Sequence, residues 1–114
     1  MADIVILDGF TTNPADNPWT PVEQLADMRV FDRTPEELIE ERASGADVLV
    51  TNKTPLSGEL FDTLDSVGFV TILATGYDNV DVVSAAEHGV PVSNVPGYST
   101  ASVAEHTFGL LLEL

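Results

Sequence analysis

Apolar residues occur in five short runs along the chain, and each run is bounded by turn-forming or charged residues. The runs lie in Asp3–Asp8, Arg29–Asp32, Ala46–Thr51, Val70–Leu73 and Val90–Val95. Continuous aliphatic and β-branched runs of this length are typical of strands that are buried on both faces of a parallel sheet. Pro91 lies near the start of the last run, where a strand tolerates proline. The pattern therefore predicts five strands.

Segments with helical spacing of apolar residues alternate with these runs. They are Pro21–Met28, Thr34–Ser44, Gly58–Leu64, Val80–His88 and Ala101–Leu114. Polar residues that could cap their amino ends are Thr20, Thr34, Ser57, Asp78 or Asn79, and Ser99 or Thr100. Gly45 and Gly89 are expected to end the second and fourth helices.

Regular alternation of strands and helices predicts a parallel sheet with right-handed crossovers. For five such units the common solution is a flavodoxin-like, doubly wound α/β fold with strand order 2-1-3-4-5 and helices on both faces. We expect residues 1–114 to form one such domain, because the chain has no internal repeat and no linker.

The last predicted helix is the most apolar part of the chain and ends in Leu110-Leu111-Leu112-Glu113-Leu114. An exposed apolar face of this kind needs cover. We therefore expect the chain to be one piece of a longer protein, or to bury this helix in a second copy. The helix is expected either to fold back on the sheet as its fifth crossover or to exchange in a homodimer. The sequence does not decide between monomer and homodimer.

The charge balance excludes several kinds of partner. The 114 residues contain 19 acidic and four basic residues, for a net charge of −15, so nucleic acid and anionic membranes are poor partners. Cysteine is absent, which excludes disulfides and thiolate chemistry. No apolar run is long enough to span a membrane, and no export signal begins the chain. These features predict a cytoplasmic protein.

Small residues follow the fourth predicted strand in Ala74-Thr75-Gly76. Gly76 can adopt a positive φ and open the turn there. Loops that leave the carboxyl ends of parallel strands meet at one edge of the sheet. We expect Asp8–Gly9, Asn52–Thr54, Ala74–Gly76 and Pro96–Tyr98 to gather there. Backbone amides, hydroxyls and the ammonium group of Lys53, the only lysine, would then recognise a carboxylate or small oxyanion.

The chain offers little for catalysis. His88 lies at a predicted helix end beside Gly89, and Glu105 and His106 are adjacent on a helix, so their side chains point in different directions. No dinucleotide fingerprint, P-loop, nucleophile elbow or metal-binding spacing is present. We therefore predict no catalytic residue and no metal site.

An alternative interpretation is a stand-alone flavodoxin-like binding or response module. Such a module needs a phosphate-binding first loop or acidic residues at the ends of the first and third strands. Asp8 has one of these places, but Asn52-Lys53 departs from the pattern at the other.

Three motifs, in order, resemble the N-terminal part of D-2-hydroxyacid dehydrogenases, most closely the glycerate dehydrogenase or hydroxypyruvate reductase branch. They are Val50–Leu56 (VTNKTPL), Leu73–Asp81 (LATGYDNVD) and Asn94–Thr100 (NVPGYST), the last continuing into Ser102–Glu105. Ile6–Gly9 and Arg33–Glu37 match as well, so the resemblance covers essentially the whole chain.

The resemblance implies a substrate domain of a two-domain enzyme. The Rossmann cofactor domain and a C-terminal return that completes the substrate domain would lie outside the 114 residues. The reaction that it implies is NAD- or NADP-dependent reduction of a small 2-keto acid such as hydroxypyruvate or glyoxylate, or the reverse.

The resemblance also implies site residues. Lys53, Ala74, Thr75 and Gly76 correspond to substrate contacts, with Thr75 also near the nicotinamide and Thr107 as a second cofactor contact. The family's catalytic Arg, Glu and His would lie beyond Leu114, and His106 does not correspond to the catalytic histidine. Alone, the chain is expected to be inactive and to bind neither cofactor tightly.

Overall fold

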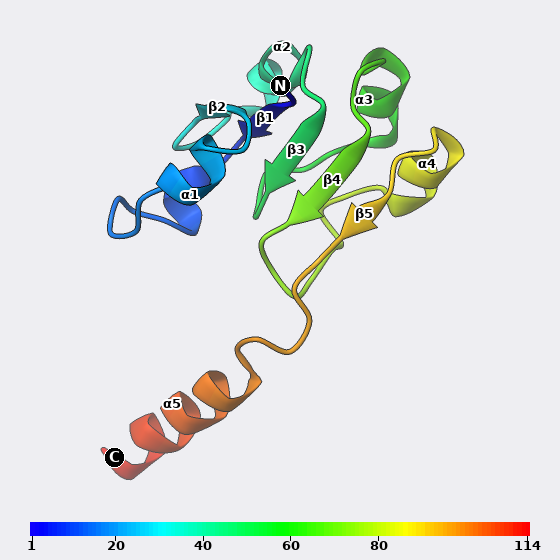
Figure 1. Ribbon diagram of the computed structural model, residues 1–114. Helices are drawn as coiled ribbons and strands as arrows, with labels where there is room; N and C mark the ends of the chain where they lie inside the picture. Colours follow the sequence, from blue (N-terminus) through cyan, green and yellow to red (C-terminus); the bar gives the residue numbers. More distant parts are fainter.

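The computed structural model describes all residues from Met1 to Leu114. Its strands are β1 (Asp3–Ile6), β2 (Asp27–Val30), β3 (Val48–Thr51), β4 (Phe69–Ile72) and β5 (Val92–Ser93). They form one five-stranded sheet in the order β2-β1-β3-β4-β5, and every pair of neighbours is parallel (Figure 1). This confirms the predicted flavodoxin-like strand order and the α/β class.

Short helices connect the strands. They are α1 (Thr20–Glu23), α2 (Ile39–Ala43), α3 (Gly58–Thr63), α4 (Val82–Glu87) and α5 (Thr100–Leu112), with single 3₁₀ turns η1 (Gly9–Thr11) and η2 (Glu36–Leu38). None of the helices combines the length and the apolar character needed to cross a membrane.

One face of the sheet carries the main core. Val5, Leu49 and Val70 are neighbours in register across β1, β3 and β4, and each is 0% exposed. The residues that cover them from α2, α3 and α4 are Ile39, Ala43, Leu60, Phe61 and Ala85. Apolar burial on this face therefore holds three of the helices on the sheet.

The opposite face has less cover. Ile4, Val48 and Phe69 are in register there, and Phe69 remains 36% exposed. Helix α1 buries none of its residues, and α5 stands away from the sheet after an extended segment (Figure 1). Helix α5 also buries no residue, so the expectation that it folds back as the fifth crossover is wrong for this structure. Exchange with a second copy stays a prediction.

The segment between β1 and α2 differs most from the sequence-based expectation. A helix was expected over Pro21–Met28, but α1 ends at Glu23 and Asp27–Val30 forms β2, two residues earlier than the expected strand. Leu25, an apolar residue within the expected helix, is 75% exposed. Asp27–Val30 forms a strand rather than a helix because it pairs along the whole of β1, and tertiary pairing overrides a weak local propensity for helix.

The expected side-chain caps are mostly absent. Trp19, Pro35, Ser57 and Ser99 occupy the N-cap positions of α1, η2, α3 and α5, and none of them makes a side-chain capping bond. The Thr34 hydroxyl instead donates to the carbonyl of Leu7 at 2.6 Å.

At α4 the N-cap is Asp81, neither Asp78 nor Asn79. Its carboxylate accepts the backbone N–H of Ser84 at 2.9 Å, which lowers the pKa of Asp81. The two helix-ending glycines are confirmed, because Gly45 and Gly89 have φ values of +78° and +71°.

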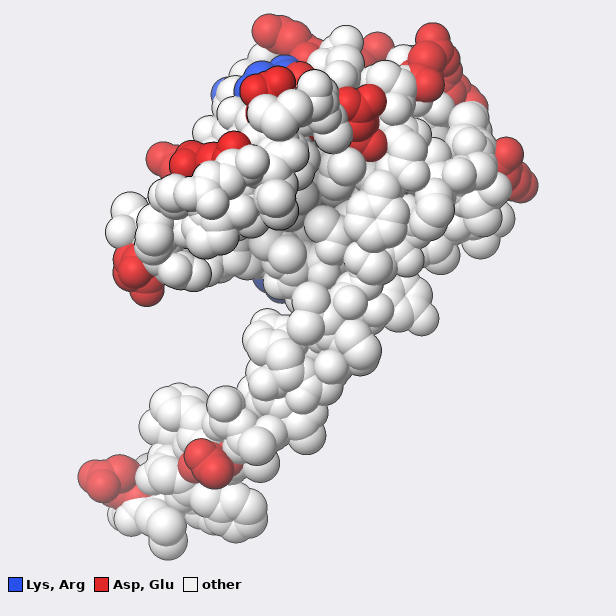
Figure 2. Space-filling model, viewed as in Figure 1, with Lys and Arg blue, Asp and Glu red and all other residues white.

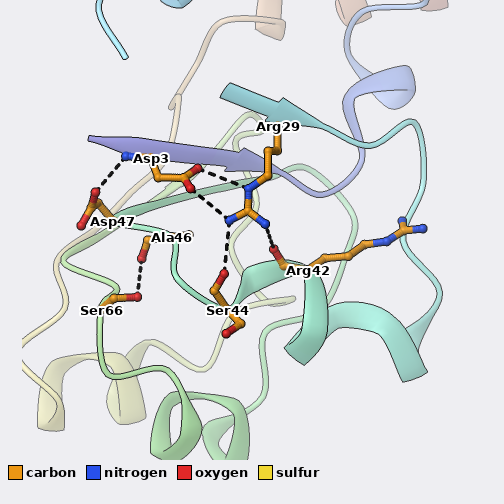
Figure 3. Close-up of polar contacts among 7 residues, drawn as sticks. All are labelled: Asp3, Arg29, Arg42, Ser44, Ala46, Asp47 and Ser66. Carbon is orange, nitrogen blue, oxygen red and sulfur yellow. Dashed lines mark hydrogen bonds and ion pairs between the residues drawn. The ribbon is translucent and has the colours of Figure 1, made fainter. Parts of the chain in front are cut away.

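Arg29 fastens β1, β2 and α2 together near the amino ends of the strands (Figure 3). Its guanidinium lies 3.3 Å from the Asp3 carboxylate and donates to the carbonyls of Arg42 and Ser44 at the carboxyl end of α2. Asp47 accepts the backbone N–H of Asp3 at 2.8 Å beside them. These contacts satisfy helix-end carbonyls that have no partner within the helix.

His88 links α3 to α4. Its Nδ1–H donates to the Ser84 carbonyl at 2.8 Å, and its Nε2 lies 3.0 Å from the Asp62 carboxylate. These two contacts raise the pKa of His88, the Ser84 carbonyl being the larger cause. The ring also lies 6.3 Å from that of Phe61.

We expect His88 to make stability depend on pH. Because folding raises the pKa of His88, its protonated form stabilises the fold at pH values below the ordinary pKa of histidine. This contribution disappears as the pH rises through the pKa of His88 in the folded protein. The free energy of unfolding lost in His88→Gln should therefore be larger near about pH 5.5 than near about pH 8.5. Urea denaturation at both pH values measures it, with Asp62→Asn as a partial mimic. A loss that is equal at both values contradicts the assignment.

The two faces of the sheet should differ in their tolerance of truncation. Leu49→Ala removes a fully buried side chain and should lower the free energy of unfolding by about 2–5 kcal/mol. Phe69→Ala on the opposite face should lower it by about 1 kcal/mol, because that side chain keeps part of its contact with water. Chemical denaturation of both variants measures the difference, and equal losses contradict the one-sided core.

Candidate functional site

The loops after β3, β4 and β5 meet at one edge of the sheet. Leu73 N–H donates to the Thr51 carbonyl at 2.8 Å, and Val95 N–H donates to the Ala74 carbonyl at 3.0 Å. A hollow of about 400 Å³ opens between these loops and the one after β1, lined by Thr11, Thr12, Asn52, Leu73, Val95 and Tyr98. The predicted gathering of loops at the carboxyl ends of the strands is therefore confirmed.

The bend Ala74–Gly76 is held from one side only. The Thr75 hydroxyl donates to the Val95 carbonyl at 3.0 Å, and the Asn94 side chain donates to the Thr75 carbonyl at 2.8 Å. Ala74 is buried, whereas Thr75 and Gly76 are exposed. The backbone N–H groups of Thr75 and Gly76 donate to no protein acceptor. Two exposed donors at a rigid turn can receive a carboxylate oxygen.

Gly76 does not have the positive φ that was expected, since only Gly45, Gly89 and Gly97 do so among the glycines. A Cβ added at Gly76 would meet only the Asp78 carboxylate, at an ordinary 3.4 Å. The backbone therefore does not require glycine here.

The loop Asn52–Thr54 behaves differently from the expectation. Its three backbone N–H groups all donate to the carboxylate of Asp8, which is only 4% exposed. These amides are therefore not available to a ligand. What the loop presents to solvent is the side chain of Lys53, which is exposed and forms no ion pair.

A second hollow, of about 560 Å³, lies beside Lys53 and shares Thr11 with the first. Its lining residues are Asp8, Thr11, Arg33, Thr34, Pro35, Arg42, Lys53, Thr54 and Pro55. Three of the four basic residues of the chain thus border one hollow. Its only carboxylate is that of Asp8, which faces the three N–H groups. These three basic side chains therefore raise the local potential at this edge of a strongly acidic chain.

Sequence analysis missed Arg33 and Arg42 at this edge. The Arg42 guanidinium lies 4.2 Å from the Phe31 ring and donates to the Arg33 carbonyl, and the Arg33 guanidinium lies 5.4 Å from the Phe10 ring. The position of Arg33 just after β2 was the available signal, because β2 ends at the same edge. Most of the surface that Figure 2 shows is uncharged, and among its charged atoms the acidic ones outnumber the basic ones.

Both histidines lie apart from this edge. His88 is bound between α3 and α4, and His106 is exposed on α5. The Thr107 hydroxyl donates within α5 to the Val103 carbonyl at 2.7 Å, and α5 stands away from the sheet (Figure 1). The structure therefore brings Lys53, Ala74, Thr75 and Gly76 to one edge and does not bring Thr107 to them. No cluster of residues suited to a metal ion is present.

Substitutions of Gly58 and Gly76 should differ in their effect on stability, because only Gly58 is closely packed. Gly58→Ala would place its Cβ 2.6 Å from the Ser84 hydroxyl and 3.0 Å from the capping Asp81 carboxylate. We expect it to lower the melting temperature by about 4–8 °C, the equivalent of about 1 kcal/mol of overpacking. Gly76→Ala should leave the melting temperature unchanged. Thermal unfolding followed by circular dichroism measures both, and a destabilised Gly76→Ala contradicts the geometry of the bend.

Several known proteins are similar to this chain in sequence. The family model for the D-isomer specific 2-hydroxyacid dehydrogenase catalytic domain matches residues 4–109. A hydroxypyruvate reductase of Blautia hydrogenotrophica is 47% identical over 97% of this chain and 35% of its own length. A glycerate dehydrogenase of Methylorubrum extorquens is 36% identical over 71% of this chain and 26% of its own. The chain thus spans about a third or less of the length of these relatives.

Solved structures agree with the sequence matches. An acyclic imino acid reductase, solved with NADPH and D-Arg, superposes with a TM-score of 0.80 at 29% identity, covering 94% of this chain and 35% of that one. A pyruvate reductase of Chlamydomonas reinhardtii gives 0.78 at 28% identity, covering 97% and 34%. Since the family model spans nearly the whole chain, this protein belongs to the D-isomer specific 2-hydroxyacid dehydrogenases, within the region that forms their catalytic domain.

Proposed function

We propose that these 114 residues are the N-terminal part of the substrate domain of an NAD- or NADP-dependent dehydrogenase that reduces a small 2-keto acid of the hydroxypyruvate or glyoxylate type. The names of the similar proteins support this substrate class. The observation that carries the proposal is the pair of exposed, unpaired N–H groups at Thr75 and Gly76, on the same edge as the unpaired ammonium of Lys53.

In this proposal the substrate carboxylate accepts hydrogen bonds from the N–H groups of Thr75 and Gly76. Ala74 packs under the bend and keeps it in place, since its carbonyl accepts the N–H of Val95. Lys53 adds a positive charge, and Arg33 and Arg42 beyond it raise the local potential for an anion. Fixed donors of this kind bind a carboxylate without reorganising when it arrives.

The nicotinamide cofactor is proposed to be held by residues outside this chain. No glycine-rich loop at a helix start is available among the 114 residues to receive a dinucleotide pyrophosphate. When bound, NADH or NADPH supplies the hydride. Thr75, which faces the ligand side of the bend, is proposed to lie near the nicotinamide. Thr107 on α5 is proposed as a second contact that forms only where a cofactor domain packs against this helix.

The chain alone is proposed to be inactive, because neither of its histidines lies at the Lys53–Gly76 edge and no dinucleotide-binding loop is available among its residues. The experiment compares the 114-residue chain with the complete enzyme, using hydroxypyruvate and glyoxylate with NADH and NADPH. We expect turnover by the complete enzyme only. Turnover by the 114-residue chain contradicts the proposal, as does a complete enzyme that turns over neither acid.

Substitution of Lys53 in the complete enzyme should weaken substrate binding. Removing the charge in Lys53→Met should raise the KM for the keto acid about tenfold, the loss of one charge-assisted contact. Lys53→Arg keeps the charge and should raise it less. Steady-state kinetics with varied keto acid measures both variants. Equal KM values for wild type and Lys53→Met would show that Lys53 does not contribute to binding of the keto acid.

A further inference from the structure

We propose that Asp8 and Asn79 are positioning residues that fix the Asn52–Thr54 loop from its two sides and thereby set where Lys53 presents its ammonium group. This inference rests on the proposed function for the role of Lys53, but its structural part stands on contacts of the described chain alone. Neither Asp8 nor Asn79 is among the residues expected to touch substrate.

Asp8 holds the loop through its amides. Its Oδ1 accepts the N–H of Asn52 at 2.9 Å, and its Oδ2 accepts the N–H of Lys53 at 2.5 Å and that of Thr54 at 2.8 Å. The carboxylate is nearly inaccessible to water and forms no ion pair. Backbone donors are thus the only groups that compensate its charge. Three charge-assisted bonds to one carboxylate restrain three consecutive residues at once.

Asn79 holds the same loop through its carbonyls. Its side-chain nitrogen lies 3.4 Å from the carbonyl oxygen of Asn52 and 3.2 Å from that of Thr54. The backbone carbonyl of Asn79 also accepts the N–H of Leu56 at 2.9 Å, within a parallel bridge between Leu56 and Val80. The segment after β4 is therefore attached to the segment after β3 at the loop itself.

Asp8 and Asn79 hold the loop from two different sides. Its N–H groups point to the end of β1, and two of its carbonyls point to the segment after β4, so the peptide units cannot rotate without breaking contacts on both sides. The Thr51 hydroxyl adds a bond to the Thr54 carbonyl at 2.8 Å. Only the side chain of Lys53 remains free to face a ligand. A long, flexible side chain on a fixed backbone loses less freedom on binding than one on a mobile loop.

The inference predicts a specific kinetic pattern in the complete enzyme. Asp8→Asn replaces one carboxylate oxygen by an NH2 group that cannot accept, so at least one of the three loop N–H groups loses its acceptor. Asn79→Ala removes the donor to the carbonyls of Asn52 and Thr54. Each should raise the KM for the keto acid about tenfold while kcat and the KM for the cofactor change less than about twofold. Asp47→Asn is the matched control, because Asp47 also accepts a backbone N–H but lies near the amino ends of the strands (Figure 3). It should leave all three constants unchanged.

A double substitution tests whether Asp8 acts through Lys53. In a Lys53→Met background, Asp8→Asn should raise the KM further by less than about twofold, because the group that it positions is gone. Additive effects overturn the inference, and so does a parallel loss of kcat and of both KM values. If Asp8→Asn fails to fold, as judged by circular dichroism, the same cycle with Asn79→Ala decides.

Amide hydrogen exchange separates this inference from the proposed function. In the wild-type protein the N–H groups of Asn52, Lys53 and Thr54 should be protected, and Asp8→Asn should remove that protection while the N–H of Leu49 in β3 stays protected. Unchanged protection of the loop overturns the positioning role. A normal KM in Lys53→Met, together with lost protection in Asp8→Asn, instead refutes the proposed role of Lys53 and leaves the fixed loop established.

Discussion

The parallel register of β1, β3 and β4 is the constraint on which the rest of the structure depends. Val5, Leu49 and Val70 lie side by side in that register, fully buried under α2 to α4. Because the three strands run in the same direction, the residues that follow them leave at one edge. Asp8, the Asn52–Thr54 loop and the Ala74–Gly76 bend therefore meet there, although they are far apart in the sequence.

Polar groups at this edge fall into two sets with different tasks. In the first set, the Asp8 carboxylate accepts the N–H groups of Asn52–Thr54, and the side-chain amide of Asn79 donates to the carbonyls of Asn52 and Thr54. The N–H groups of Thr75 and Gly76 have no such partner, and both residues are exposed. The first set gives the edge its shape, and the second is what a bound carboxylate can reach.

Much of the fold could be predicted from the sequence, because each strand of the core is a continuous apolar run and each helix after the second strand is bounded by a glycine or a cap-like residue. The end of the segment Pro21–Met28 could not be predicted, since Asp27 and Met28 belong to β2 through pairing with β1 rather than through local propensity. Lys53 and the Ala74–Gly76 bend could be placed at the edge from their positions after strands. The hydrogen bonds from the Asn52–Thr54 amides to Asp8 could not be predicted, because a carboxylate at a strand end can face either solvent or a neighbouring loop.

The distribution of charge at the edge follows from the same arrangement. With a net charge of −15, the chain repels an anionic ligand at long range, and only local cations can offset that repulsion. Arg33, Arg42 and Lys53 provide them from the ends of β2 and β3 and from α2. The single carboxylate among them, that of Asp8, accepts three backbone N–H groups and forms no ion pair with the three cations. The acid that shapes this edge therefore leaves the ammonium of Lys53 without an ion-pair partner, so that it can meet an anion.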